Sequence, residues 1–135
     1  PCGIISKSRS EAMGKKILII EDYPATSKMI SDILEMEGFT PIIAQDGTIG
    51  LEKAVSEQPA LILLDIMLPG INGLEVCSRL HANPQTKDIP VIMVSVKSSN
   101  EDVKAGLAKG ANGYVAKPFD PFKLLEIVKQ HLGTT

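Results

Sequence analysis

Apolar strand-like runs and amphipathic helix-like segments alternate five times between residues 16 and 132, and this alternation constrains the fold more than any other feature. It is typical of a parallel sheet with helices packed on both faces. The expected strands are Lys16–Ile20, Thr40–Ala44, Ala60–Asp65, Val91–Ser95 and Gly113–Ala116. The expected helices are Pro24–Glu37, Gly47–Glu57, a helix capped by Asn72 that ends at Ala82, a helix from Ser99 or Asn100 to Gly110, and Pro121–Leu132.

Pro41 and the most apolar runs restrict the order of the strands. Proline cannot donate to a central ladder, so Thr40–Ala44 is expected at an edge of the sheet. Lys16–Ile20 and Ala60–Asp65 are apolar over most of their length, which is typical of strands buried on both faces. With right-handed crossovers, these constraints favour the strand order 2-1-3-4-5. We therefore predict an α/β fold with a flavodoxin-like, doubly wound, five-stranded parallel sheet and five helices.

Polar side chains stand where four of these strands end. Glu21 and Asp22 follow the first strand, Asp65 ends the third, Ser95 ends the fourth, and Lys117 follows the fifth. The carboxyl ends of parallel strands share one edge, which is where such sheets bind ligands. We expect three carboxylates, a hydroxyl and an ammonium group to converge in one pocket at this edge.

The expected pocket has more negative than positive charge, because three carboxylates face one ammonium group. Like charges this close repel each other unless a cation lies between them. An all-oxygen, carboxylate-rich site favours a hard divalent ion, and Mg²⁺ suits a partial site that leaves room for water. Asp65 then becomes a candidate nucleophile that forms an aspartyl phosphate. The alternative reading is that these acids are solvated loop residues with no shared function.

The composition indicates a single domain. The chain has 135 residues and a net charge of −2, which gives no general attraction to nucleic acid or to an anionic membrane. It lacks any apolar stretch near the roughly 20 residues that span a bilayer, and residues 1–15 lack a signal-peptide pattern. We expect residues 1–14 to form a flexible leader and residues 15–135 to form the domain. Cys2 and Cys77 are expected to be unpaired thiols of a cytoplasmic protein.

Five separated motifs within Lys16–Leu132 are similar to those of the receiver domain of two-component response regulators, the CheY-like family. The motifs are the acidic pair Glu21-Asp22, Asp65 with its downstream Pro69-Gly70-Asn72-Gly73, Ser95, Tyr114, and Lys117-Pro118-Phe119. Each motif is weak by itself, whereas the ordered set is specific.

The resemblance implies a phosphoacceptor switch that promotes its own phosphorylation and dephosphorylation and turns over no external substrate. Asp65 would accept a phosphoryl group from the phosphohistidine of a sensor histidine kinase or phosphotransfer protein. Ser95 and Tyr114 would be the switch pair, and Lys117 would pair with the phosphoryl group. The implied Mg²⁺ ligands are Glu21, directly or through water, Asp22, Asp65 and the backbone carbonyl of Met67.

The implied output surface consists of Ser99–Ala108, Gly113–Ala116 and Pro121–Leu132. It would contact a downstream effector domain or protein, and it is also the candidate surface for a homodimer. Direct contact with nucleic acid and membrane insertion are not expected.

Four positions depart from or vary within the family pattern. Glu21 stands where aspartate is commoner, and its longer arm is expected to change how metal-bound water is held. Val96 stands where a smaller residue is usual, so its branched side chain is expected to narrow access to the phosphoryl group. Met67 and Lys97 flank the site at variable positions and are expected to influence the lifetime of the phosphoryl group.

Other functions fit the sequence less well. A phosphohydrolase with an aspartate nucleophile commonly has a second aspartate two residues later, where this chain has Met67. A flavin-binding protein needs a phosphate-cradling loop after the first strand, where Glu21 and Asp22 would repel phosphate. The remaining alternative is a degenerate receiver that acts as a phosphorylation-independent interaction module.

Overall fold

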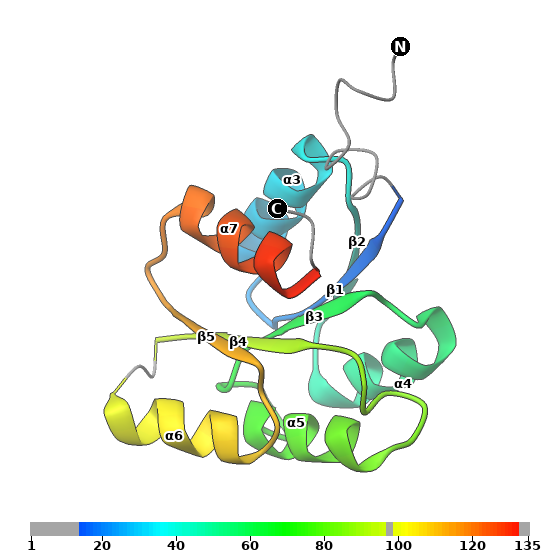
Figure 1. Cartoon of the computed structure of the whole chain (residues 1–135), viewed down its shortest axis with the longest axis vertical. Helices are drawn as coiled ribbons and strands as arrows, with labels where there is room; N and C mark the ends of the chain where they lie inside the picture. The colour runs from blue at the N-terminus through cyan, green and yellow to red at the C-terminus, as the bar shows by residue number, and fades with distance from the viewer. Residues whose placement is uncertain (1–13, 97–98, 133–135) are drawn as a thin grey trace.

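A five-stranded parallel sheet lies between two layers of helices in the computed structural model, which describes residues 14–96 and 99–132 (Figure 1). The strands are β1 (Lys16–Ile20), β2 (Thr40–Ala44), β3 (Leu61–Leu64), β4 (Val91–Ser95) and β5 (Gly113–Ala116). The helices are α3 (Pro24–Met36), α4 (Gly47–Glu57), α5 (Gly73–Ala82), α6 (Asn100–Ala108) and α7 (Pro121–Leu132). The strand order is β2-β1-β3-β4-β5 with all neighbours parallel, so the predicted topology is confirmed.

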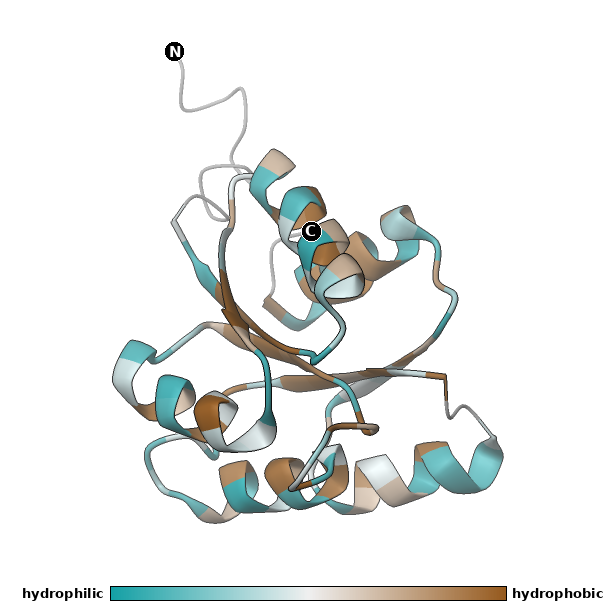
Figure 2. Ribbon diagram, turned by 180° about the vertical axis from the view of Figure 1, so that it is seen from behind, coloured by the Kyte–Doolittle hydropathy of each residue, from teal (hydrophilic) through white to brown (hydrophobic). Residues whose placement is uncertain are grey.

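Successive strand residues point to opposite faces of the sheet, which builds two separate apolar cores. Ile17 and Ile19 of β1 pack with α3 and α7 on one face, whereas Leu18 and Ile20 pack with α4 and α5 on the other. In Figure 1, α3 and α7 lie above the sheet, and α4, α5 and α6 lie below it. Figure 2 shows the apolar strands enclosed by helices whose polar residues face outward. Each leucine or isoleucine buried in this way stabilises the fold by about 2 kcal/mol.

Pro41 lies in the edge strand β2, opposite Ile17 of β1. The missing N–H of the proline therefore leaves no central ladder incomplete. The apolar strand β3 lies in the middle of the sheet and is buried along its whole length. Both positions agree with the sequence prediction.

The ends of three predicted elements differ from the structure by one or two residues. Strand β3 is shorter at both ends than Ala60–Asp65, although Ala60 N and Asp65 N still donate to carbonyl oxygens of β1 at 2.8 and 3.1 Å. Helix α3 ends one residue before Glu37 because Gly38 adopts the left-handed φ of +92°. Helix α6 ends two residues before Gly110, where φ is +107°.

Side-chain caps begin three of the helices at the predicted places. Asp46 accepts a hydrogen bond from Ile49 N at 2.8 Å, and Asn72 accepts one from Glu75 N at 3.0 Å. Ser99 forms a reciprocal capping box with Asp102 at the start of α6. Each cap satisfies a backbone N–H that the first helical turn leaves without a partner.

Two predictions concern the ends and the thiols of the chain. The leader predicted for residues 1–14 lies outside the described residues except for Gly14, whose N–H donates to Gly38 O at 3.1 Å. Cys2 also lies outside them, whereas Cys77 is a buried free thiol whose pKa is raised by burial to about 11. Among the described residues, each helix is too short or too polar to cross a membrane.

The cap at Asp46 gives a test of the fold. Replacing Asp46 by alanine should lower the free energy of unfolding by about 1 kcal/mol, because the N–H of Ile49 loses its acceptor. Urea denaturation followed by circular dichroism measures this change. Asp46→Asn keeps a side-chain acceptor and should stay within a few tenths of a kcal/mol of the wild type. Equal losses in both variants would show that the cap does not stabilise α4.

Candidate functional site

The ammonium group of Lys117 joins two carboxylates that are far apart in the sequence. Its Nζ lies 3.0 Å from Asp65 Oδ2 and also forms an ion pair with Glu21 Oε1. Glu21 follows β1, Asp65 follows β3 and Lys117 follows β5, so the carboxyl ends of three strands bring them together. The side chains of Glu21, Asp65 and Lys117 are 4%, 9% and 16% exposed. Solvent therefore screens the two ion pairs of Lys117 only weakly.

The carboxylate of Asp65 is held in place from both sides. Its Oδ1 accepts a hydrogen bond from Met67 N at 3.0 Å, while its Oδ2 faces Lys117. This contact with the backbone N–H of residue i+2 is an Asx turn, which aspartate side chains commonly form. Asp65 thus presents one fixed carboxylate at the rim of the sheet.

Gly73 at the start of α5 allows the backbone around Asp65 to approach this helix. A Cβ at Gly73 would lie 2.1 Å from the carbonyl oxygen of Asp65 and 2.5 Å from the Cα of Ile66. The N–H of Gly73 donates to Ile66 O at 2.7 Å. The motif that contains Gly73 gives no sign of this role, whereas the structure shows that any side chain there would push against the backbone of the site.

Glu21, Asp22 and Asp65 form an acidic cluster. One carboxylate oxygen from each lies within 4.8 Å of the others, and Asp22 is exposed whereas the other two are buried. Opposite ligands of an octahedral Mg²⁺ lie about 4.2 Å apart, and the ion usually retains several waters. Three carboxylates against one ammonium leave an excess of two negative charges, which a divalent cation would balance. The donor set therefore fits Mg²⁺.

Burial and the contact with the partner have opposite effects on the pKa of Glu21, and likewise on the pKa of Lys117. Burial raises the pKa of Glu21, the neighbouring charge of Asp65 adds to this, and hydrogen bonds from Lys117 and Tyr23 N offset only part of it. Burial alone would lower the pKa of Lys117, but its hydrogen bonds to Glu21 and Asp65 outweigh burial and raise it. The lysine therefore remains a cation, and the surroundings of Glu21 favour additional positive charge.

Ser95 and Val96 stand at the end of β4 with opposite exposures. Ser95 is fully buried, and its carbonyl accepts a hydrogen bond from Lys117 N at 2.9 Å, which ties β4 to the start of the lysine loop. Val96 is 60% exposed and Met67 is 51% exposed, so two apolar side chains stand at the rim. Lys97 lies outside the described residues.

Tyr114 lies on β5 with its ring against α6. A Cβ at Gly106 would lie 3.3 Å from Tyr114 Cε2, so the glycine leaves the space that the half-buried ring needs. Burial raises the pKa of Tyr114, and the charges of Asp102 and Asp65 raise it further, which keeps the phenol protonated.

Helix α6 covers the sheet loosely beside this tyrosine. Gly106 is the one buried residue within Asn100–Ala108. A cavity of about 430 Å³ lies between α6 and the loop after β3, lined by Ile66, Met67, Leu68, Asn72, Leu74, Asp102 and Ala105. The sequence of α6 gives no sign of this cavity, because its lining comes from residues far apart in the chain.

The sequence profile of the response regulator receiver domain matches residues 17–129. The match runs from β1 into α7 and contains all of the residues brought together above. The chain belongs to the response regulator receiver family. Receiver domains of this family are the signal-receiving modules of two-component systems, so the resemblance drawn from the five motifs is confirmed.

Named members of the family are similar to most of this chain. The response regulator ArlR of Staphylococcus saprophyticus is 45% identical over 87% of this chain and 52% of that protein. RpaA of Synechocystis, a DNA-binding dual master transcriptional regulator, is 43% identical over 89% of this chain and 50% of that protein. The receiver therefore spans about half the length of the curated relatives it matches.

A solved receiver structure agrees with the fold in detail. The receiver domain of a sensor histidine kinase from Pseudomonas aeruginosa is 28% identical, with a TM-score of 0.83 over 89% of this chain and 98% of that chain. That structure holds a magnesium ion in its active-site cleft.

Replacing Gly73 by alanine tests the close approach at Asp65. The added Cβ meets rigid backbone, so the free energy of unfolding should fall by about 1–3 kcal/mol. Gly70→Ala is the matched control in the same loop. Gly70 has a φ of +73° but open space around the added Cβ, and a left-handed alanine should cost about 1 kcal/mol. Urea denaturation compares the two, and a loss for Gly73→Ala no larger than that for Gly70→Ala would contradict the steric account.

Proposed function

We propose that Asp65 accepts a phosphoryl group from the phosphohistidine of a sensor histidine kinase or phosphotransfer protein, in a reaction that depends on Mg²⁺. The observation that carries this proposal is the lysine-bridged carboxylate pair of Glu21 and Asp65, with Asp22 beside it. A pocket of this kind offers one nucleophile, one fixed cation and a divalent metal site within a few ångströms.

Phosphoryl transfer demands positioning and charge neutralisation more than covalent chemistry. A carboxylate oxygen of Asp65 would attack phosphorus as the bond between phosphorus and the histidine nitrogen breaks. The electron pair of that P–N bond would return to the imidazole, which then takes up a proton. Met67 N and Lys117 hold the Asp65 carboxylate for this attack. Mg²⁺, held by Glu21, Asp22, Asp65 and the proposed carbonyl of Met67, would supply positive charge next to the phosphoryl oxygens.

Ser95 and Tyr114 are the proposed switch pair. Phosphorylation replaces one negative charge by about two and adds acceptor oxygens. Ser95 would move toward those oxygens from its buried position at the end of β4, and the ring of Tyr114 would follow into the vacated space. The cavity between α6 and the loop after β3, and the single buried residue of that helix, support a displacement of α6 during this change.

The surface formed by α6, β5 and α7 would carry the signal to a downstream effector domain or protein. The two states need differ by only a few kcal/mol for phosphorylation to change their populations. RpaA is named as a DNA-binding regulator, but the region that matches this chain is only about half of RpaA. We propose that this receiver acts on an effector and makes no direct contact with nucleic acid, since its net charge of −2 offers no basic footprint.

A degenerate receiver that only binds partners is the second candidate. Val96 favours it, because this branched side chain, which is 60% exposed and next to Ser95, would narrow the approach to Asp65. The intact cluster of Glu21, Asp22, Asp65 and Lys117 favours the phosphoacceptor instead.

Incubation with acetyl phosphate and Mg²⁺, followed by intact mass spectrometry, tests the acceptor. The wild type should gain one phosphoryl group, and Asp65→Asn should gain none because the nucleophile is lost while the fold remains. Asp32→Asn is the matched control, since Asp32 is an exposed partner of Lys28 on α3. Phosphorylation of Asp65→Asn at the wild-type rate would refute Asp65 as acceptor, and an unreactive wild type would favour the degenerate receiver.

The metal site has a test of its own that needs no phosphoryl donor. At ten times its dissociation constant, Mg²⁺ should stabilise the folded state by about 1.4 kcal/mol, which raises Tm by roughly 5 °C for a domain of this size. Asp22→Asn removes one carboxylate of the cluster and should abolish most of this increase, whereas Asp32→Asn should retain it. An unchanged Tm of the wild type in Mg²⁺ would count against the site.

A further inference from the structure

Strand β2 forms one edge of the sheet and has no charged residue of its own. Its sequence, Thr-Pro-Ile-Ile-Ala, contains two adjacent isoleucines, and Ile43 is 36% exposed. An apolar edge strand is a template for pairing with another chain, because its outward N–H and C=O groups have no strand beside them. This edge is therefore open to strand addition unless its backbone groups are blocked in another way.

Two hydrogen bonds to the β1 segment show which residues of β2 face outward. Thr40 donates its N–H to the backbone just before β1, at 2.8 Å, and the Ala44 carbonyl accepts from the backbone just after β1, at 3.0 Å. Successive residues of a strand alternate between its two neighbours, so Pro41 and Ile43 face away from the sheet. The outer edge of β2 thus consists of the backbone groups of these two residues.

Two of the four outward backbone groups cannot serve a new strand. Pro41 has no N–H to donate. The carbonyl oxygen of Ile43 is bonded to Lys53 of α4, whose Nζ lies 2.8 Å away. A hydrogen bond from an ammonium group is stronger than one from a backbone N–H, so a new strand does not readily replace it. At most one acceptor, Pro41 O, and one donor, Ile43 N, remain, which are too few for a ladder.

The packing of α4 places Lys53 beside this edge. Gly50, one turn earlier, lies close to β1, because a Cβ there would be 2.5 Å from Ile20 Cδ1. Ala54, which follows Lys53, is fully buried in the same core as Ile20. The backbone of α4 is thus fixed against the sheet before and after Lys53. The long side chain reaches from there to the edge strand, 10 positions earlier in the chain.

We infer that Pro41 and Lys53 together close this edge of the sheet against strand addition by a second copy of the chain. The proline removes a donor and the lysine occupies an acceptor, so each outward residue loses one of its two backbone groups. Lys53 also brings a positive charge to an edge strand that has none. Two β2 edges that approach each other would therefore meet like charges as well as incomplete hydrogen bonding.

Sedimentation velocity of the full chain and its variants tests this inference. The double change Pro41→Val and Lys53→Met restores the missing N–H and frees the Ile43 carbonyl. We expect the double variant to associate about tenfold more strongly than the wild type, or more, between about 5 and about 500 µM. Each single change should give a smaller increase. Lys53→Arg keeps a cationic donor that can reach the same carbonyl and should behave like the wild type.

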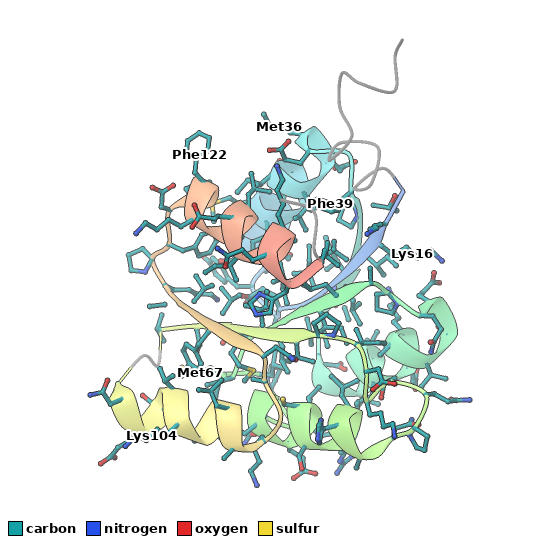
Figure 3. All side chains as sticks on the ribbon, viewed as in Figure 1. Lys16, Met36, Phe39, Met67, Lys104 and Phe122 are labelled. Atoms are coloured by element: carbon teal, nitrogen blue, oxygen red, sulfur yellow. The ribbon has the colours of Figure 1, made fainter. Side chains whose placement is uncertain are left out.

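Lys104→Met is the matched control, because it also removes a positive charge and adds an apolar side chain. Lys104 is an exposed residue of α6, and Figure 3 shows its side chain directed away from the sheet. This variant should associate like the wild type. Circular dichroism confirms that each variant is folded, and Lys53→Met alone carries the test if Pro41→Val disturbs the fold.

Hydrogen exchange of the Ile43 amide identifies the surface that associates. Its N–H faces outward, so pairing between two β2 edges should slow its exchange as the double variant is concentrated. Strand β5 forms the opposite edge of the sheet. A dimer through the expected surface of α6, β5 and α7 would therefore leave exchange at Ile43 unchanged.

Three results would overturn the proposal. A double variant that associates no more than the wild type would show that the edge needs no protection. An equal increase in Lys104→Met would assign the association to general apolar contact. An increase without slower exchange at Ile43 would place the contact away from β2. None of these outcomes depends on phosphorylation, so the inference is tested independently of the acceptor at Asp65.

Discussion

The ion pair of Lys117 with Glu21 and Asp65 is the interaction on which the site depends. A buried carboxylate without a partner costs several kcal/mol, and two of them side by side cost more because they repel. Lys117 reduces this cost without removing it, which is why the pKa of Glu21 remains raised. The site is therefore folded in a state that still attracts positive charge. A divalent metal ion fits that condition better than a neutral ligand would.

The sheet determines which residues share this site. Glu21, Asp65 and Lys117 each follow a strand, and parallel pairing brings their strand ends to one edge although up to 96 positions separate them in the chain. This part of the structure was predictable from the sequence because apolar runs, Pro41 and right-handed crossovers leave few strand orders. The helix caps at Asp46, Asn72 and Ser99 were predictable as well, since capping depends only on neighbouring residues.

Other features depend on distances that no local pattern encodes. The approach of Gly73 to Asp65, the ring of Tyr114 against Gly106 and the cavity beside Asp102 arise where elements meet. The same holds for Phe122, which sits in an apolar helix pattern and would be expected in the core. Its 80% exposure follows from how α7 is rotated on the sheet, with Leu124 and Val128 facing inward. The roles of the metal ligands and of the switch pair go beyond packing and stay predictions.

The close contact at Gly73 makes the packing around Asp65 tighter on the side of α5 than on the side of α6. On the α5 side, the backbone of Gly73 packs directly against the backbone of Asp65 and Ile66, so there is no space for Asp65 to move toward α5. On the α6 side, a helix with one buried residue borders a cavity that separates it from the loop after β3. We expect added charge or bulk at Asp65 to displace α6 rather than α5, because the packing is weakest there.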